Sequence, residues 1–155
     1  SLRMPTLYCF KPLNFKNNKQ RQQYTRLVRN VKKTLPIAKE VNRAIIETYE
    51  FLQTLPDEKA RQKHLNAVEK SVKEQYTPRM KKLTFAQGKL LIKLINRETD
   101  SSSFELVKAF LGPFKAGFYQ AFAAIFGASL KKEYHPEGED AMVEQIVLLV
   151  ESGQI

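Results

Sequence analysis

The chain of 155 residues has one cysteine, Cys9, only two histidines and no tryptophan. A single cysteine excludes a disulfide within the chain but leaves the compartment open, because many envelope proteins lack disulfides. His64 and His135 do not stand at metal-ligand spacing from cysteine or acidic residues, so we expect no metal. A glycine-rich phosphate loop is missing, and the serines at 101–103 have no nearby histidine to activate them. We therefore expect no cofactor, and no sequence pattern matches a catalytic motif.

The chain also lacks an apolar run long enough for a membrane. Residues 116–130 are uncharged, but they fall short of the ~20 apolar residues that a transmembrane helix needs. Phenylalanines recur at a spacing of four through this stretch, at Phe114, Phe118, Phe122 and Phe126. That spacing places the rings on one face of a helix, either as core or as the lining of a hydrophobic pocket. We favour core, as part of a buried, aromatic-rich central pair of helices.

Apolar periodicity elsewhere predicts an all-α fold, a single compact helical bundle of six or seven helices. Proline is expected to end the first helix at Pro36 and to kink or restart the third at Pro78. Thr84 and Gln87 form a capping box at the start of a largely apolar helix. The expected helices cover residues 18–34, 36–52, 57–80, 84–97, 102–111, 113–130 and 139–152. Residues 1–16 are expected to form an extended N-terminal arm, and residues 17–155 a single helical domain.

Charge is distributed unevenly along the chain. Residues 1–39 contain ten lysines or arginines and no acid, whereas residues 133–155 contain six acids and no lysine or arginine. The two ends either neutralise each other within the fold or leave a basic surface for an anionic partner. Arg26, Arg29 and Lys33 recur at three- and four-residue spacing, opposite the apolar stripe of the first helix. We expect these three side chains to face either water or the acidic C-terminal end.

A polar cluster is predicted where helices end. Arg97 and Glu98 end the central helix, Glu105 opens the next, and Tyr134 and Glu139 flank the last loop. Projected on a helix, Glu139 lies on the buried side, so we expect it to pair with Arg97. One interpretation is an acid/base or ligand-gripping site of a hydrolase-like or transferase-like enzyme. The other is helix-end electrostatics with one structural ion pair, and we favour it.

Three separated segments, at residues 24–33, 87–106 and 133–140, carry a resemblance. In them the sequence resembles an uncharacterised family of Bacteroidetes proteins known only as a domain of unknown function. The resemblance implies a secretory signal upstream of Ser1 and export to the periplasm or cell envelope. Such families more often have aspartate than histidine at His135, which speaks against a catalytic role for this residue.

These observations favour a non-enzymatic binding or scaffold domain of the envelope. Its expected partner is an anionic envelope component or another protein, held through Arg26, Arg29 and Lys33. The enzyme built around Arg97 and its neighbours is one alternative, and a nucleic-acid binder is another. Nucleic acid is less expected, because the exposed face of the first helix is basic without interleaved aromatic residues.

Overall fold

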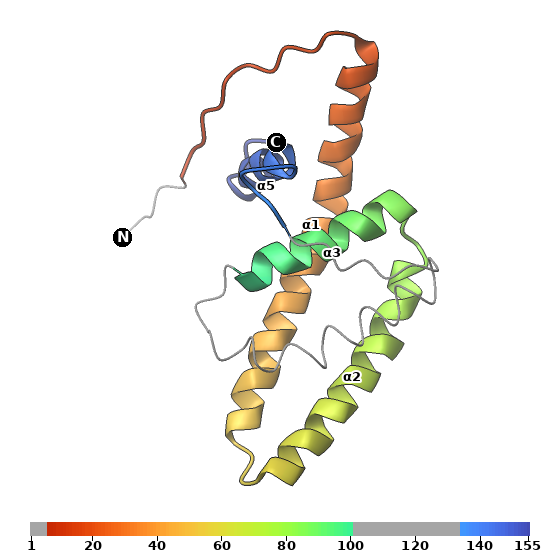
Figure 1. The fold of residues 1–155 in the computed structure, drawn as a ribbon, viewed down its shortest axis with the longest axis vertical. Coiled ribbons are helices and arrows are strands. Elements are labelled where there is room, and N and C mark those ends of the chain that lie inside the picture. The colour runs from red at the N-terminus through yellow and green to blue at the C-terminus, as the bar shows by residue number, and fades with distance from the viewer. Residues whose placement is uncertain (1–5, 101–133) are drawn as a thin grey trace.

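The computed structural model describes residues 6–100 and 134–155, and all of its regular structure in those ranges is helical. The helices are α1 (Asn18–Gln53), α2 (Glu58–Met80), α3 (Phe85–Asp100) and α5 (Ala141–Glu151), as Figure 1 shows. The all-α class is therefore confirmed. The phenylalanine ladder and the short helix before it lie outside the described residues.

Helix α1 corrects the predicted number of helices. It continues through Pro36, so the two helices expected on either side of this proline are one helix of 36 residues. A proline inside a helix costs about 3 kcal/mol, because it lacks an N–H and crowds the preceding turn. Pro36 is exposed, while Val31, Leu35 and Ala38 beside it are buried in the core. Packing of the buried side offsets the missing bond on the solvent side, and the helix stays continuous.

Helix α2 likewise continues through Pro78 and ends two residues later, at Met80. With four helices described in place of the five expected over these ranges, the prediction of six or seven helices is not supported.

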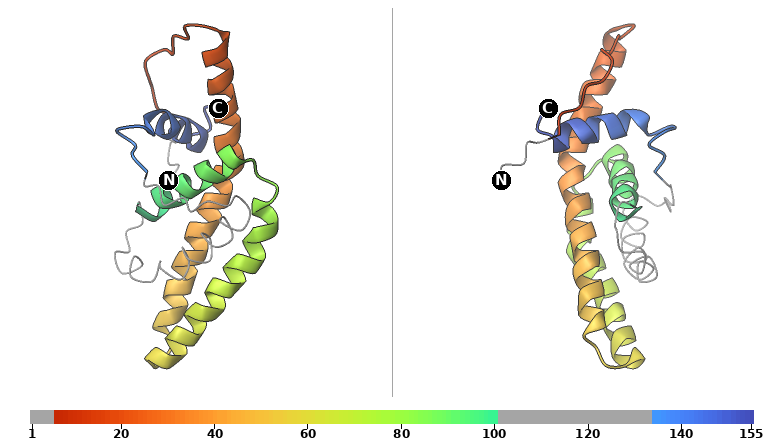
Figure 2. Two further views of the ribbon diagram at one scale, coloured as in Figure 1. Left: turned by 45° about the vertical axis from the view of Figure 1, so that its right-hand side comes forward. Right: turned by 90° about the vertical axis from the view of Figure 1, so that its left-hand side faces the viewer.

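Helix α1 forms the long axis of the molecule, and the other helices pack along it. Helices α3 and α5 cross its middle, and α2 returns antiparallel to its C-terminal half (Figures 1 and 2). The core lies where α1, α3 and α5 meet, with Val41, Leu91, Leu94 and Ile146 fully buried. Beyond that crossing, the N-terminal turns of α1 project past α3 and α5 (Figure 1).

Helix α3 lies in the middle of the bundle, as its sequence predicts. The capping box is confirmed: the Thr84 main-chain N–H donates to Gln87 Oε1 at 3.0 Å, and the Gln87 N–H donates to Thr84 Oγ1 at 3.2 Å. The Gln87 side chain also donates to Asn30 Oδ1 of α1 at 3.1 Å. The start of α3 is thus tied to α1, which fixes the position of Lys93 and Arg97 further along the helix.

Residues 6–17 form neither helix nor strand and arch from the start of α1 back to the C-terminus (Figure 1). The Gln154 side chain holds them there. Its Oε1 accepts from the Tyr8 main-chain N–H and its Nε2 donates to the Tyr8 carbonyl, both at 2.8 Å. Among the helices that the structure describes, none combines the length and apolar character that crossing a membrane requires.

Candidate functional site

Arg97, near the end of α3, is the centre of a network of charged side chains. Its Nε and Nη2 donate to the two carboxylate oxygens of Glu144 on α5, at 2.8 and 3.1 Å. Its Nη1 donates to Glu98 Oε1 at 2.7 Å, and its Nη2 also lies 3.1 Å from Glu151 Oε1. Only 13% of the Arg97 side chain is exposed. Every guanidinium nitrogen is therefore engaged by a carboxylate, in a largely buried position.

Two further side chains extend this network to the preceding loop and to α1. The Tyr134 hydroxyl donates to Glu144 Oε2 at 2.6 Å. Lys39 Nζ donates to Glu151 Oε2 at 3.1 Å and lies 3.4 Å from Glu98 Oε1. We call these residues the Arg97 network: Lys39, Arg97, Glu98, Tyr134, Glu144 and Glu151. It joins α1, α3, α5 and the loop before α5.

The network shifts the pKa values of three of its members, Arg97, Tyr134 and Glu144. Burial alone would lower the pKa of Arg97, but its hydrogen bonds to Glu144 and the negative charges of Glu144, Glu151 and Glu98 raise it above its usual range. Burial raises the pKa of Glu144, but hydrogen bonds from Arg97 and Tyr134 outweigh this and lower it. Burial and the hydrogen bond to Glu144 raise the pKa of Tyr134. Arg97 and Glu144 are therefore ionised, and Tyr134 keeps its proton, at neutral pH.

The predicted pair of Glu139 with Arg97 is wrong. Glu139 lies 3.2 Å from Lys93 Nζ instead, and 63% of its side chain is exposed. The cause is the start of α5 at Ala141, which leaves Glu139 in the preceding turn and off the inward face of the helix. Glu144, one turn into α5, takes the position beside Arg97.

Lys93 forms a second ion pair one turn before Arg97. Its Nζ donates to Asp140 Oδ1 at 2.6 Å, and the Asp140 side chain is only 4% exposed. The other carboxylate oxygen of Asp140 accepts from the His135 main-chain N–H at 2.9 Å. Burial would lower the pKa of Lys93, but the hydrogen bonds that Lys93 donates to Asp140 and Glu139 raise it. Asp140 thus anchors the loop that leads into α5.

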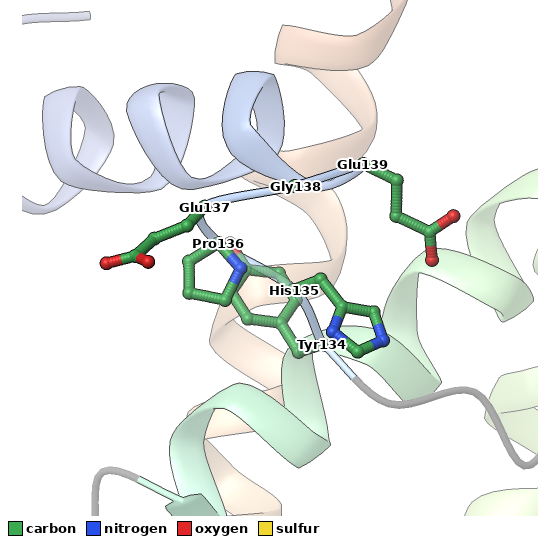
Figure 3. Close-up of a pocket in the computed structure, with 6 residues that line it drawn as sticks. All are labelled: Tyr134, His135, Pro136, Glu137, Gly138 and Glu139. Carbon is green, nitrogen blue, oxygen red and sulfur yellow. The ribbon is translucent and has the colours of Figure 1, made fainter.

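That loop borders a pocket of about 440 Å³, lined in the described region by residues 134–139. Figure 3 shows the side chains of His135 and Glu139 directed to one side of the loop and that of Glu137 to the other. Within residues 6–100 and 134–155, no three His, Cys, Asp or Glu side chains gather as a metal site requires. His64 lies apart from this loop, in a groove of about 300 Å³ between α1 and α2, with its ring centroid 4.5 Å from that of Phe51.

The structure brings together only some of the residues predicted for a catalytic site. Arg97, Glu98 and Tyr134 meet around Glu144, Glu139 belongs to the Lys93 pair, and Glu105 lies outside the described residues. The Tyr134 hydroxyl donates its hydrogen bond to a carboxylate, and each nitrogen of Arg97 already binds a carboxylate. This arrangement holds helices together.

Sequence reasoning did not place the acids that Arg97 binds. Glu144 and Glu151 are seven residues apart on α5, which puts them on one side of the helix. That spacing was the available signal, but it does not reveal which cation faces them.

Arg26, Arg29 and Lys33, which we call the basic face, are exposed on the N-terminal half of α1. None of the three forms an ion pair within the part of the chain that the structure describes. Of the basic residues at positions 6–39, only Lys39 pairs with an acid there. The described acids of the C-terminal end are held mainly by Lys93 and Arg97. Mutual neutralisation of the two ends therefore involves Lys39 and leaves the basic face in water.

Comparison with protein families gives one match. The chain belongs to the family described as Domain of unknown function (DUF4294), which covers residues 1–149. A search of curated proteins found no match, and neither did a search of solved structures.

Proposed function

We propose that this protein is a non-enzymatic binding domain of the cell envelope whose basic face holds an anionic partner. The observation that supports the proposal is the contrast between the two ends of the chain. Among the described residues, the buried carboxylates bind Lys39, Lys93 and Arg97, while the cations of the basic face have no acidic partner. Cations that do not stabilise the fold remain available to a ligand.

The basic face is also well placed for a partner with repeated charges. Arg26 and Lys33 are seven residues apart, or roughly 10 Å along the helix axis. Lys19, a further seven residues towards the N-terminus, is exposed on the same side of α1. These side chains lie on the exposed side of α1, opposite its buried stripe, so an extended anion has room to lie along them. A phosphorylated lipid surface or an acidic glycan has this chemistry.

The envelope location belongs to the proposal and rests on the resemblance to secreted Bacteroidetes proteins. If it holds, fractionation of cells that produce the full-length protein will recover it in the periplasmic or envelope fraction. Recovery in the cytosol alone would contradict the envelope location. Binding of an anion by the basic face is tested separately.

The binding proposal is tested with a charge-reversal variant, R26E/R29E/K33E. Its matched control is K59E/K63E/K70E on α2, where the three lysines are also exposed and share one side of the helix. Each variant replaces three positive charges by negative ones, so both change the net charge of +10 by the same amount. Binding is measured to anionic vesicles, to neutral vesicles and to an acidic polysaccharide, at low and at physiological salt.

We expect the wild-type protein and the α2 control to bind an anionic ligand, and R26E/R29E/K33E to lose most of that binding without a change in its melting curve. Higher salt should weaken the binding, because the Debye length falls to about 8 Å at physiological ionic strength. Equal loss in both variants would show that net charge alone is responsible. A lowered melting temperature in R26E/R29E/K33E would show that the basic face stabilises the fold, and either result would overturn the proposal.

A further inference from the structure

The N-terminal segment of residues 6–16, which we call the arm, carries aromatic rings that are partly exposed, together with two exposed lysines. The rings of Tyr8 and Phe10 are nearly parallel, with an interplanar angle of 12° and centroids 6.3 Å apart. Phe10 is 36% exposed and Tyr8 is half-buried. Two parallel rings on alternate residues of an extended chain offer their faces to planar ligands.

The arm is held at both ends, so these rings have a defined place. At one end, the Gln154 side chain binds both main-chain polar groups of Tyr8. At the other end, the centroid of the Phe15 ring lies 5.5 Å from that of the Tyr24 ring on α1. The Arg21 guanidinium lies 5.9 Å from the Phe15 centroid. Gln154 contacts only the main chain of Tyr8, so it does not cover the Tyr8 ring, which lies against that of Phe10.

Basic residues follow the rings along the chain, from Lys11 next to Phe10 to the start of α1. Lys11 and Lys16 on the arm and Lys19 and Arg21 at the start of α1 are exposed. None of them pairs with an acid in the described ranges, and residues 1–39 contain no acid. The exposed side of the N-terminal half of α1 has no fully exposed aromatic ring, whereas the arm carries Phe10 at 36% exposure.

We propose that the arm binds single-stranded nucleic acid, with bases stacking on Tyr8 and Phe10 and phosphates held by the neighbouring lysines. Proteins that bind single strands combine an electropositive track with aromatic rings, because every base has a face that can stack. With their centroids 6.3 Å apart and their planes nearly parallel, the two rings each present an outer face on which a base can stack. This inference goes beyond the proposed function, because it depends on the rings of the arm and not on Arg26, Arg29 and Lys33.

The test compares two labelled ligands with the same number of phosphates: a short oligothymidylate and an abasic oligomer of equal length. Fluorescence anisotropy measures the affinity of the full chain for each. The ring variant is Y8A/F10A, and the matched control is L7A/C9A, which changes the alternate residues of the same segment. Leu7 is 72% exposed and Cys9 is exposed, so the control should not disturb the fold.

We expect wild type and L7A/C9A to bind oligothymidylate at least about tenfold more tightly than the abasic oligomer, since each stacked base typically supplies that much. In Y8A/F10A this preference should vanish, while the salt-dependent affinity for both oligomers remains. Equal affinity of the wild type for the two oligomers, or an unchanged preference in Y8A/F10A, would overturn the inference.

Two further measurements separate this inference from its competitors. R26E/R29E/K33E should keep the preference for bases, so a failure of the basic-face proposal leaves this result intact. Vesicle binding that requires Tyr8 and Phe10, with no preference for oligothymidylate, would show that the rings enter a lipid bilayer instead. That outcome would refute nucleic-acid binding by the arm.

Discussion

Replacing Arg97 by methionine tests whether the Arg97 network holds the helices together. In R97M, Glu98 and Glu151 keep Lys39, but Glu144 keeps only the Tyr134 hydroxyl. Removing one partner of a buried ion pair costs about 3–5 kcal/mol, because the other charge is left uncompensated. For a chain of this length, 1 kcal/mol corresponds to roughly 2–4 °C in melting temperature. We therefore expect R97M to melt on the order of 10 °C below the wild type.

A double-mutant cycle identifies the partner whose loss causes this cost. R97M and E144Q should be coupled by about 1–3 kcal/mol in urea denaturation. The matched control is a cycle of R97M with E139Q, which should be additive within about 0.5 kcal/mol, because Glu139 is mostly exposed and contacts Lys93. Negligible coupling between Arg97 and Glu144, or strong coupling between Arg97 and Glu139, would refute the network.

Two further predictions follow from the same part of the fold. K93M should lower the free energy of unfolding by about 3 kcal/mol, because it leaves buried Asp140 without its cation. E139Q should change the free energy of unfolding by less than about 0.5 kcal/mol, because Glu139 is mostly exposed. Equal effects of the two variants in urea denaturation would contradict this. Arg97 and Tyr134 lower the pKa of Glu144 below its usual 4.5, so its contribution is complete above that pH and is lost as the pH falls through the lowered value. Wild-type melting temperature should therefore fall more steeply below about pH 4.5 than that of E144Q, and parallel curves would exclude Glu144 as a source of acid sensitivity.

The sequence predicts those features of the fold that depend on local pattern. Apolar periodicity locates helical segments, and the capping box of Thr84 and Gln87 marks the start of α3, because both follow from the spacing of nearby residues. Pro36 shows the limit of this reasoning. Its local preference is to end a helix, but packing of Val31, Leu35 and Ala38 against the core outweighs that preference, and packing is not visible in a local window.

The candidate site shows the same division. Exposure of Arg26, Arg29 and Lys33 follows from their position opposite the apolar stripe of one helix. Helix α5 begins two residues later than predicted, so Glu139 lies before the helix and contacts Lys93, while Glu144 within the helix contacts Arg97. Helix boundaries are uncertain by about this much, because the last turn frays and has few contacts of its own. The partners in charged pairs between helices could therefore be assigned only from the structure.

The central claim is that the basic face of α1 binds an anionic partner through charge. The most direct measurement is the salt dependence of binding to an acidic polysaccharide, for wild type and for R26E/R29E/K33E. On a plot of log association constant against log salt concentration, each cation that contacts a flexible polyanion contributes a slope of roughly 0.7. We predict that removing the three cations reduces the slope by about 2. Equal slopes for the two proteins would show that Arg26, Arg29 and Lys33 do not contact the ligand, and would contradict the account.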